Sequence, residues 1–151
     1  MAWRPWAGMA HIVDEGSHFD VPVETIWRFL QSPDHGTSHP EHRNPQAKPL
    51  SETSAQVSWE QELEGRTVKV VNRITMFPPL GIVVEQTEGP LAGSKFFNFY
   101  TPKGSRTAVT IVGDFRSPTV PEAQLEAIVR RNFEQVFAQD TAALKQFTAK
   151  R

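Results

Sequence analysis

The chain has 151 residues, with 16 Lys and Arg against 17 Asp and Glu, so its formal net charge is -1. This balance gives no electrostatic reason to expect nucleic acid or an anionic membrane as the main partner, and it fits a neutral ligand better. The chain has no cysteine, which excludes disulfides, thiolate metal ligands and cysteine nucleophiles. We expect a single domain over residues 1–151 and, by default, a cytoplasmic location.

The first ten residues hold Trp3 and Trp6 but no apolar run approaching the ~20 residues that cross a bilayer. No signal-peptide core follows them. We interpret residues 1–10 as a loosely ordered extension of a soluble, unexported protein without stable membrane insertion. The tryptophan pair keeps a further alternative open, a protein-interaction module that exposes an aromatic patch and associates with itself as a homodimer.

The segment from His11 to Val21 alternates apolar and polar residues with a period near two, which predicts a half-buried first strand with Val13 and Phe19 on one face. The residues V-P-V-E-T-I-W-R-F-L that follow carry one apolar stripe and predict a short amphipathic helix. Residues 32–49 are polar and rich in proline and histidine, so we expect a loop there, with at most one short helical turn.

From Ala55 to Arg116, turn residues recur at intervals of about ten, which predicts five consecutive strands joined as hairpins. Alternation along each strand then assigns an inward face. The inward residues predicted in this way are Val57, Trp59, Leu63, Val68, Val70, Ile74, Met76, Val109, Ile111 and Phe115. The run K-F-F-N-F-Y at 95–100 has aromatic residues on both faces, and we place Phe97 and Phe99 inward.

The stretch from Pro121 to Phe147 has apolar residues at the helical period of 3.6 and predicts a long amphipathic helix. The elements together predict an α+β protein of the helix-grip type, a curved antiparallel sheet of about six strands around a long C-terminal helix. Six strands make a face about 29 Å wide, whereas a helix is only about 10 Å across. Large side chains or an empty space must fill the difference.

We therefore predict an apolar cavity that holds a small hydrophobic molecule, such as a lipid, an isoprenoid or an aromatic compound. A tightly packed core is the alternative for each aromatic residue. The predicted cavity residues are Trp59, Gln61, Asn72, Ile74, Met76, Phe97, Phe99, Ile111, Phe115, Val129, Phe133, Val136, Phe137 and Asp140. The amides of Gln61 and Asn72 could orient a polar group of the ligand or could be satisfied within the core.

With these elements placed, the chain resembles the START-like helix-grip superfamily, which includes birch-pollen-allergen-like proteins, polyketide cyclases and lipid-transfer domains. The resemblance rests on F-D-V-P-V-E-T-I-W-R-F-L at residues 19–30, on G-D-F at 113–115 and on the closing amphipathic helix. It implies that a ligand lies between the long helix and the sheet. The superfamily uses one cavity for transport, sensing, cyclisation and dehydration, so the resemblance implies no particular substrate.

Polar residues suggest three further interpretations. Asp140 interrupts the apolar stripe of the long helix, where it could act as a cavity acid or form a structural ion pair. His35 and His39 could act with Asp140 as acid–base groups of a cyclase or dehydratase. His35, His39 and His42 are spaced i, i+4, i+7, which on a helix would place three imidazoles on one face as an alternative zinc site, although Pro40 disfavours one continuous helix and the pattern matches no specific metal motif. Between these readings, we expect ligand binding without a metal or other cofactor.

Overall fold

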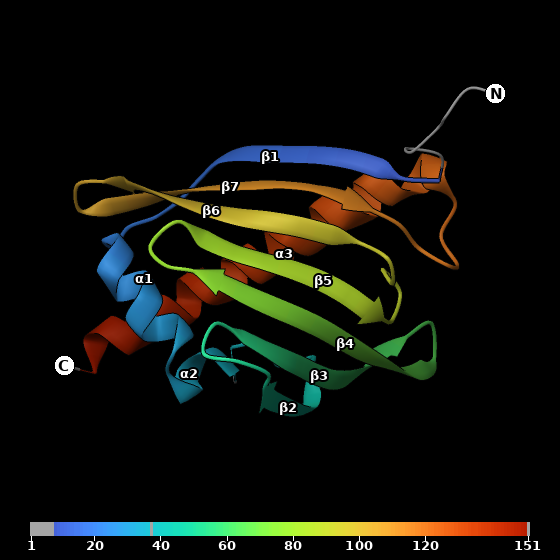
Figure 1. Cartoon of the computed structure of the whole chain (residues 1–151), viewed down its shortest axis with the longest axis horizontal. Coiled ribbons are helices and arrows are strands. Elements are labelled where there is room, and N and C mark those ends of the chain that lie inside the picture. Colours follow the sequence, from blue (N-terminus) through green and yellow to red (C-terminus); the bar gives the residue numbers. More distant parts are fainter. Residues whose placement is uncertain (1–7, 37, 151) are drawn as a thin grey trace.

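The computed structural model describes residues 8–36 and 38–150, so the roles predicted for Trp3 and Trp6 lie outside the described residues. Seven antiparallel strands form one sheet in the order β1-β7-β6-β5-β4-β3-β2. A long helix, α3, crosses one face of this sheet, and two short helices, α1 and α2, lie at one end (Figure 1). The elements are β1 (Ala10–Phe19), α1 (Val23–Leu30), α2 (Pro33–Gly36), β2 (Arg43–Pro49), β3 (Ser54–Leu63), β4 (Arg66–Phe77), β5 (Gly81–Glu88), β6 (Lys95–Lys103), β7 (Arg106–Phe115) and α3 (Glu122–Ala149).

This arrangement confirms the predicted α+β helix-grip architecture, including the five consecutive hairpin strands β3 to β7. The additional strand is β2, which lies inside the segment that the sequence predicts as a loop. It pairs with β3 at the edge of the sheet, and all seven of its residues are exposed. A strand exposed on both faces has no need of apolar alternation, so its sequence carries no strand period.

A bulge in β1 changes which of its side chains face the helix. The pairing of β1 with β7 shifts register between Asp14 and Ser17, and Gly16 adopts a φ of 96°. The extra residue reverses the alternation along the strand. Phe19 is therefore buried whereas Val13 is 44% exposed, and the prediction that they share a face is wrong.

The orientation predicted for β6 is also wrong. Phe97 and Phe99 are 37% and 41% exposed and stack on each other on the outer face, with ring centroids 5.5 Å apart. Phe96 and Tyr100 point inward instead. The reason lies on the next strand, where Gly113 pairs with Phe96 and a Cβ atom there would lie 2.3 Å from the Phe96 Cβ. Only a glycine leaves room for Phe96 against the helix.

Elsewhere the predicted faces agree with the register. Trp59 pairs with Val70, and Ile74 pairs with Val84, which places these four side chains on the face that looks toward α3. Leu63 has the same alternation as Trp59 but lies next to the β3–β4 turn and is 37% exposed, so it does not belong to the core.

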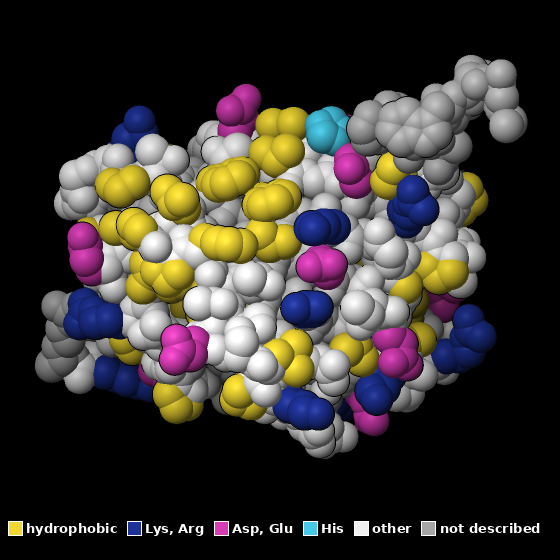
Figure 2. All heavy atoms as spheres, viewed as in Figure 1, with side chains coloured by type: hydrophobic (Ala, Val, Ile, Leu, Met, Phe, Trp, Pro, Cys, Tyr) yellow, Lys and Arg dark blue, Asp and Glu magenta, His cyan; other side chains and the backbone are white. Residues whose placement is uncertain are grey.

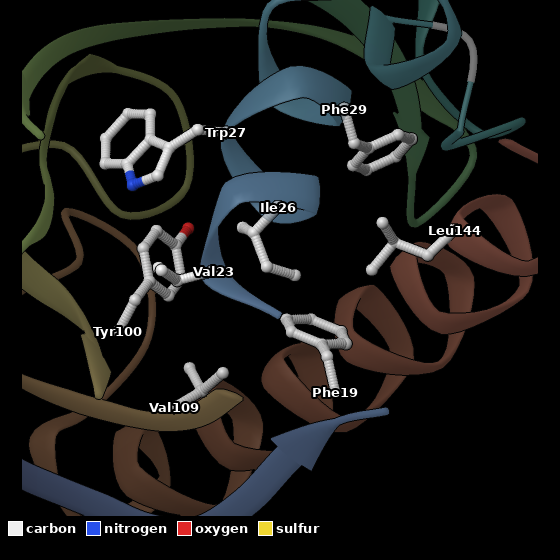
Figure 3. Close-up of a cluster of buried hydrophobic side chains, with 8 residues drawn as sticks. All are labelled: Phe19, Val23, Ile26, Trp27, Phe29, Tyr100, Val109 and Leu144. Atoms are coloured by element: carbon white, nitrogen blue, oxygen red, sulfur yellow. The ribbon is translucent and has the colours of Figure 1, made fainter. Parts of the chain in front are cut away.

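Two buried clusters join α3 to the sheet. The first half of the helix packs on β1 and β7 through Ile12, Phe115, Leu125, Val129 and Phe133, which are all at most 7% exposed. The second cluster lies beneath α1 and is shown in Figure 3; it contains Phe19, Val23, Ile26, Trp27, Phe29, Tyr100, Val109 and Leu144. The helix is thus anchored along one side of the sheet and at one end.

Candidate functional site

The inner face of the sheet, which looks toward α3, is covered unevenly by that helix. Beside β1 and β7 the helix seals the core, as Val129 and Phe115 are fully buried. On the opposite side, Trp59 and Met76 face the helix, and Phe137 lies on the helix, yet all three remain partly exposed. Solvent therefore reaches apolar side chains between the C-terminal half of α3 and the strands β3 and β4. We call this region the concave face below.

The predicted cavity residues divide accordingly. Ile74 is partly exposed on the inner face of β4, Ile111 of β7 packs against both buried clusters, and Val136 is partly exposed on α3, whereas Phe115, Val129 and Phe133 belong to the sealed core. Two surface hollows occur elsewhere, one at the β1 bulge beside Gly16 and His18, and one beside Met9 and Glu126. Neither of these two hollows lies on the concave face.

The amides on the inner face of the sheet differ in whether they have partners. The Trp59 Nε1–H donates to Gln61 Oε1 at 2.7 Å, and the Gln86 amide donates to Asn72 Oδ1 at 3.2 Å. The oxygen atom of each predicted ligand amide therefore already has a donor within the chain. Asn98 Oδ1, which the sequence analysis missed, is buried and has no hydrogen-bond partner among the described residues. Asn98 pairs with Ile82 and Ile111, so it lies within the inner face.

A polar cluster lies between α2, the loop that follows it, and α3. His39 Nε2 lies 3.4 Å from Asp140 Oδ1, and these side chains are only 11% and 19% exposed. The hydroxyl of Ser38 donates to the same carboxylate at 3.3 Å. One nitrogen of His35, one of His39 and an oxygen of Asp140 all lie within 4.8 Å of one another. The predicted acid–base set is thus brought together.

A chain of hydrogen bonds determines which nitrogen of His39 carries a proton. Glu41 can only accept, so the 2.9 Å bond between Glu41 and the Gln139 amide uses the Gln139 NH2 group. Gln139 Oε1 then accepts from His39 Nδ1–H at 2.5 Å. In a neutral His39 ring, Nε2 therefore presents its lone pair to Asp140. Two lone pairs that face each other at 3.4 Å need a proton or a cation between them.

Burial acts on the ionisation of this cluster. Desolvation raises the pKa of Asp140, while the nearby His35 and His39 and the Ser38 hydrogen bond oppose that rise. Desolvation also lowers the pKa of His35, and the charge of Asp140 opposes this effect. Both shifts favour uncharged side chains, as expected for groups removed from water.

His42 does not belong to the cluster of donor atoms, so the structure contradicts the predicted set of three histidines. The His42 ring stacks on Trp59, with centroids 4.0 Å apart and an interplanar angle of 17°. Burial lowers its pKa to about 4, and the neighbouring His39 acts in the same direction. His42 connects the polar cluster to the concave face through Trp59.

Tyr100 is a second inner-face residue that the sequence analysis missed, because the orientation of 95–100 was reversed. Its ring contacts Trp27 edge-on, with centroids 5.9 Å apart, and Figure 3 shows its hydroxyl directed into the cluster beneath α1. Burial raises the pKa of Tyr100, and the charge of Asp140 adds to the rise. A possible signal is Gly113, which pairs with Phe96 and leaves room for its ring, because Phe96 and Tyr100 lie on the same face of β6.

Comparisons with solved structures agree on the fold. The Zhui aromatase/cyclase from Streptomyces sp. R1128 has a TM-score of 0.70 and 14% identity over 95% of each chain. A START superfamily protein from Mycobacterium smegmatis has a TM-score of 0.72 and 13% identity, over 92% of this chain and 98% of that one. Norcoclaurine synthase from Thalictrum flavum has a TM-score of 0.64 and 10% identity, over 97% and 91%.

No protein-family model and no curated protein matches the sequence. At these identities the structural matches establish the fold and leave the activity open. Among the described residues, no helix has the length and apolarity that a membrane crossing requires.

Proposed function

We propose that this chain, which has the START-like helix-grip fold, binds a small hydrophobic molecule between α3 and the concave face. The observation that carries the proposal is the partial exposure of Trp59, Met76 and Phe137, large apolar side chains that face the interior without being sealed in it. A ligand that covers them removes apolar surface from water, at about 25 cal/mol per Å². A closed core would leave no such surface to cover.

The polar groups of the inner face define the second property of the ligand. Asn98 Oδ1 is a buried acceptor that has no partner in the described part of the chain, and such a group costs about 1–3 kcal/mol while it stays unsatisfied. A ligand hydroxyl or N–H would supply the missing donor. We therefore propose a neutral, largely apolar ligand with one donor group, in keeping with the net charge of -1.

Binding of 2-naphthol, a neutral aromatic alcohol, tests the site by isothermal titration calorimetry. Met76→Trp should fill the concave face and weaken binding at least about tenfold. Thr75→Trp is the matched control, because Thr75 is the adjacent residue on the same strand and pairs with Val83, on the outer face. It should change the affinity by less than about twofold. Equal effects of the two substitutions, or no binding to the unaltered chain, would contradict the proposal.

The second candidate function is catalysis on the bound molecule. It is favoured by the approach of His39 Nε2 to Asp140 Oδ1 at 3.4 Å and by the aromatase/cyclase among the structural neighbours. Such an enzyme would place its acid–base pair beside the ligand and remove water from a hydroxyl-bearing substrate. Incubation with a polyketide-like β-hydroxy ketone and mass spectrometry would detect the loss of one water. Asp140→Asn should abolish that loss in an enzyme and leave 2-naphthol affinity nearly unchanged in a carrier.

We also propose that the outer face of the sheet pairs with a second copy of the chain. Figure 2 shows hydrophobic side chains gathered over the outer face of the sheet, beside a row of charges of alternating sign. The pairing register identifies the charged row as Arg73, Glu85, Lys95 and Asp114, on four consecutive strands. A two-fold axis parallel to the strands, between β5 and β6, would place each charge opposite its complement in the other copy.

The same axis places the 37%-exposed Phe97 of each copy over the strand position of Val83 in the other, because these two residues are paired neighbours on β6 and β5; Val83 itself is 5% exposed. Glu85→Lys should then weaken self-association in sedimentation velocity, since two lysines would face each other across the axis. The exchange Glu85→Lys with Lys95→Glu should restore it. A monomeric unaltered chain, or no recovery in the exchanged variant, would contradict this pairing.

A further inference from the structure

We propose that His35, His39 and Asp140 form a binding site for a divalent transition-metal ion, with Zn²⁺ as the simplest occupant. The proposal departs from the sequence-based expectation of no metal, and from the three-histidine set considered there. It does not depend on the hydrophobic ligand, because all three side chains belong to α2, its following loop and α3.

The separations suit such an ion. In a tetrahedral zinc site with bonds of about 2.1 Å, two donor atoms are about 3.4 Å apart. His39 Nε2 and Asp140 Oδ1 are 3.4 Å apart in the structure. The nitrogen of His35 lies within 4.8 Å of both, so only its ring has to move closer. Two imidazoles with one carboxylate favour Zn²⁺, Fe²⁺ or Co²⁺ over the oxygen-seeking Mg²⁺ and Ca²⁺.

The hydrogen-bond relay behind His39 is an independent observation that points the same way. Histidine ligands commonly donate the second ring N–H to a fixed acceptor, which orients the other nitrogen toward the metal. Here Nδ1–H donates to Gln139, whose amide is held in turn by Glu41. The relay leaves the Nε2 lone pair toward Asp140, so the position between these two atoms suits a metal ion as well as a proton.

The position in the fold gives the site an open side. Three protein ligands leave at least one coordination position for water or for an oxygen of a bound molecule. The cluster adjoins the concave face, because the His39 ring lies 5.0 Å from His42, which stacks on Trp59. The metal would also hold α2 and its loop against α3, so its binding should stabilise the fold.

Titration of the untagged full chain with Co²⁺, after treatment with a chelator, tests the site directly. We expect one Co²⁺ per chain, the intense visible absorption of a four- or five-coordinate ion, and a higher Tm with either Co²⁺ or Zn²⁺. His39→Ala and Asp140→Asn should each abolish the absorption. Gln139→Leu, which removes only the acceptor behind His39, should weaken the affinity about 10- to 100-fold.

Two controls separate this site from other histidines. His42→Ala should change the affinity by less than about twofold, although His42 lies beside the cluster. The double variant His11→Ala with His18→Ala removes two exposed histidines that contact Asp114 and Asp20 and should also leave binding intact. Circular dichroism establishes that each variant is folded. The absence of Co²⁺ binding, or binding that survives in folded His39→Ala and Asp140→Asn, would overturn the proposal.

Discussion

Tyr100 is the one tyrosine of the chain, which makes its ionisation separately measurable. Burial raises the pKa of Tyr100 in the folded state, whereas the unfolded chain ionises near the usual value of about 10. A raised folded pKa stabilises the fold fully below pH ~10, and this contribution is lost as the pH rises toward the folded pKa.

The expected slope above pH ~10 is a fall in the free energy of unfolding of about 1.4 kcal/mol per pH unit. Near-ultraviolet absorbance should show no tyrosinate until the protein unfolds, and Tyr100→Phe should remove this part of the slope. Gradual ionisation of the folded protein near pH 10 would mean that Tyr100 faces solvent.

Asn98 is the residue at which stability and function should oppose each other. Its unpartnered Oδ1 costs stability, so Asn98→Leu should raise the free energy of unfolding by about 1 kcal/mol in urea denaturation. The same substitution removes the acceptor proposed for the ligand and should weaken 2-naphthol binding. Asn72→Leu is the matched comparison, because the Gln86 amide already satisfies Asn72, and it should destabilise the protein. Lower stability in Asn98→Leu would show that the oxygen is satisfied by water.

At single residues, the sequence could identify Asp140, because a carboxylate within an apolar helical stripe needs a partner. It could also propose His35 and His39 as acid–base groups, but it did not predict that they lie beside that carboxylate. It could not predict that His42 stacks on Trp59 instead, since that contact depends on how the loop leaves α2. Asn98 and Tyr100 were missed because the predicted orientation of strand β6 was reversed.

Alternation does not show which face of strand β6 points inward, because five of the six residues from 95 to 100 are long or aromatic. The orientation of β6 depends on its partner strand β7, where Gly113 makes room for Phe96. Bulges have the same effect within a strand, as the reversal between Val13 and Phe19 shows. Strand β2 is polar because it lies exposed at the edge of the sheet, so its pairing with β3 left no trace in its hydrophobic pattern.

Neighbouring substitutions test the orientation of β6. Phe96→Ala removes a ring that packs 5.3 Å from Phe115 and 5.8 Å from Phe133, between ring centroids. It should lower the free energy of unfolding by about 3 kcal/mol. Phe97→Ala removes an exposed ring and should change the stability by less than about 1 kcal/mol. Urea denaturation measures both, and the reverse order would show that the strand faces the other way.

For the architecture of the chain, prediction from sequence succeeds where the patterns are long. The 28-residue helix α3, the meander and the gripping arrangement follow from a helical period sustained over many residues and from regularly spaced turns. The extent of the ligand space does not follow, because it depends on how closely the helix lies against each strand. The helix is sealed on β1 and β7 and open toward β3 and β4, an asymmetry that no local pattern records.

The central claim is that a small apolar molecule enters between α3 and the concave face, and Met76 reports on that space. The chain has three methionines, and Met76 is the one on the inner face, while Met9 lies beside the start of β1. NMR spectra of ¹³C-methyl-labelled methionines during addition of 2-naphthol test the claim most directly. We predict a saturable shift of the Met76 methyl signal, by ring currents of the bound aromatic, with the Met9 signal unchanged. A Met76 signal that stays in place while 2-naphthol binds would contradict the account.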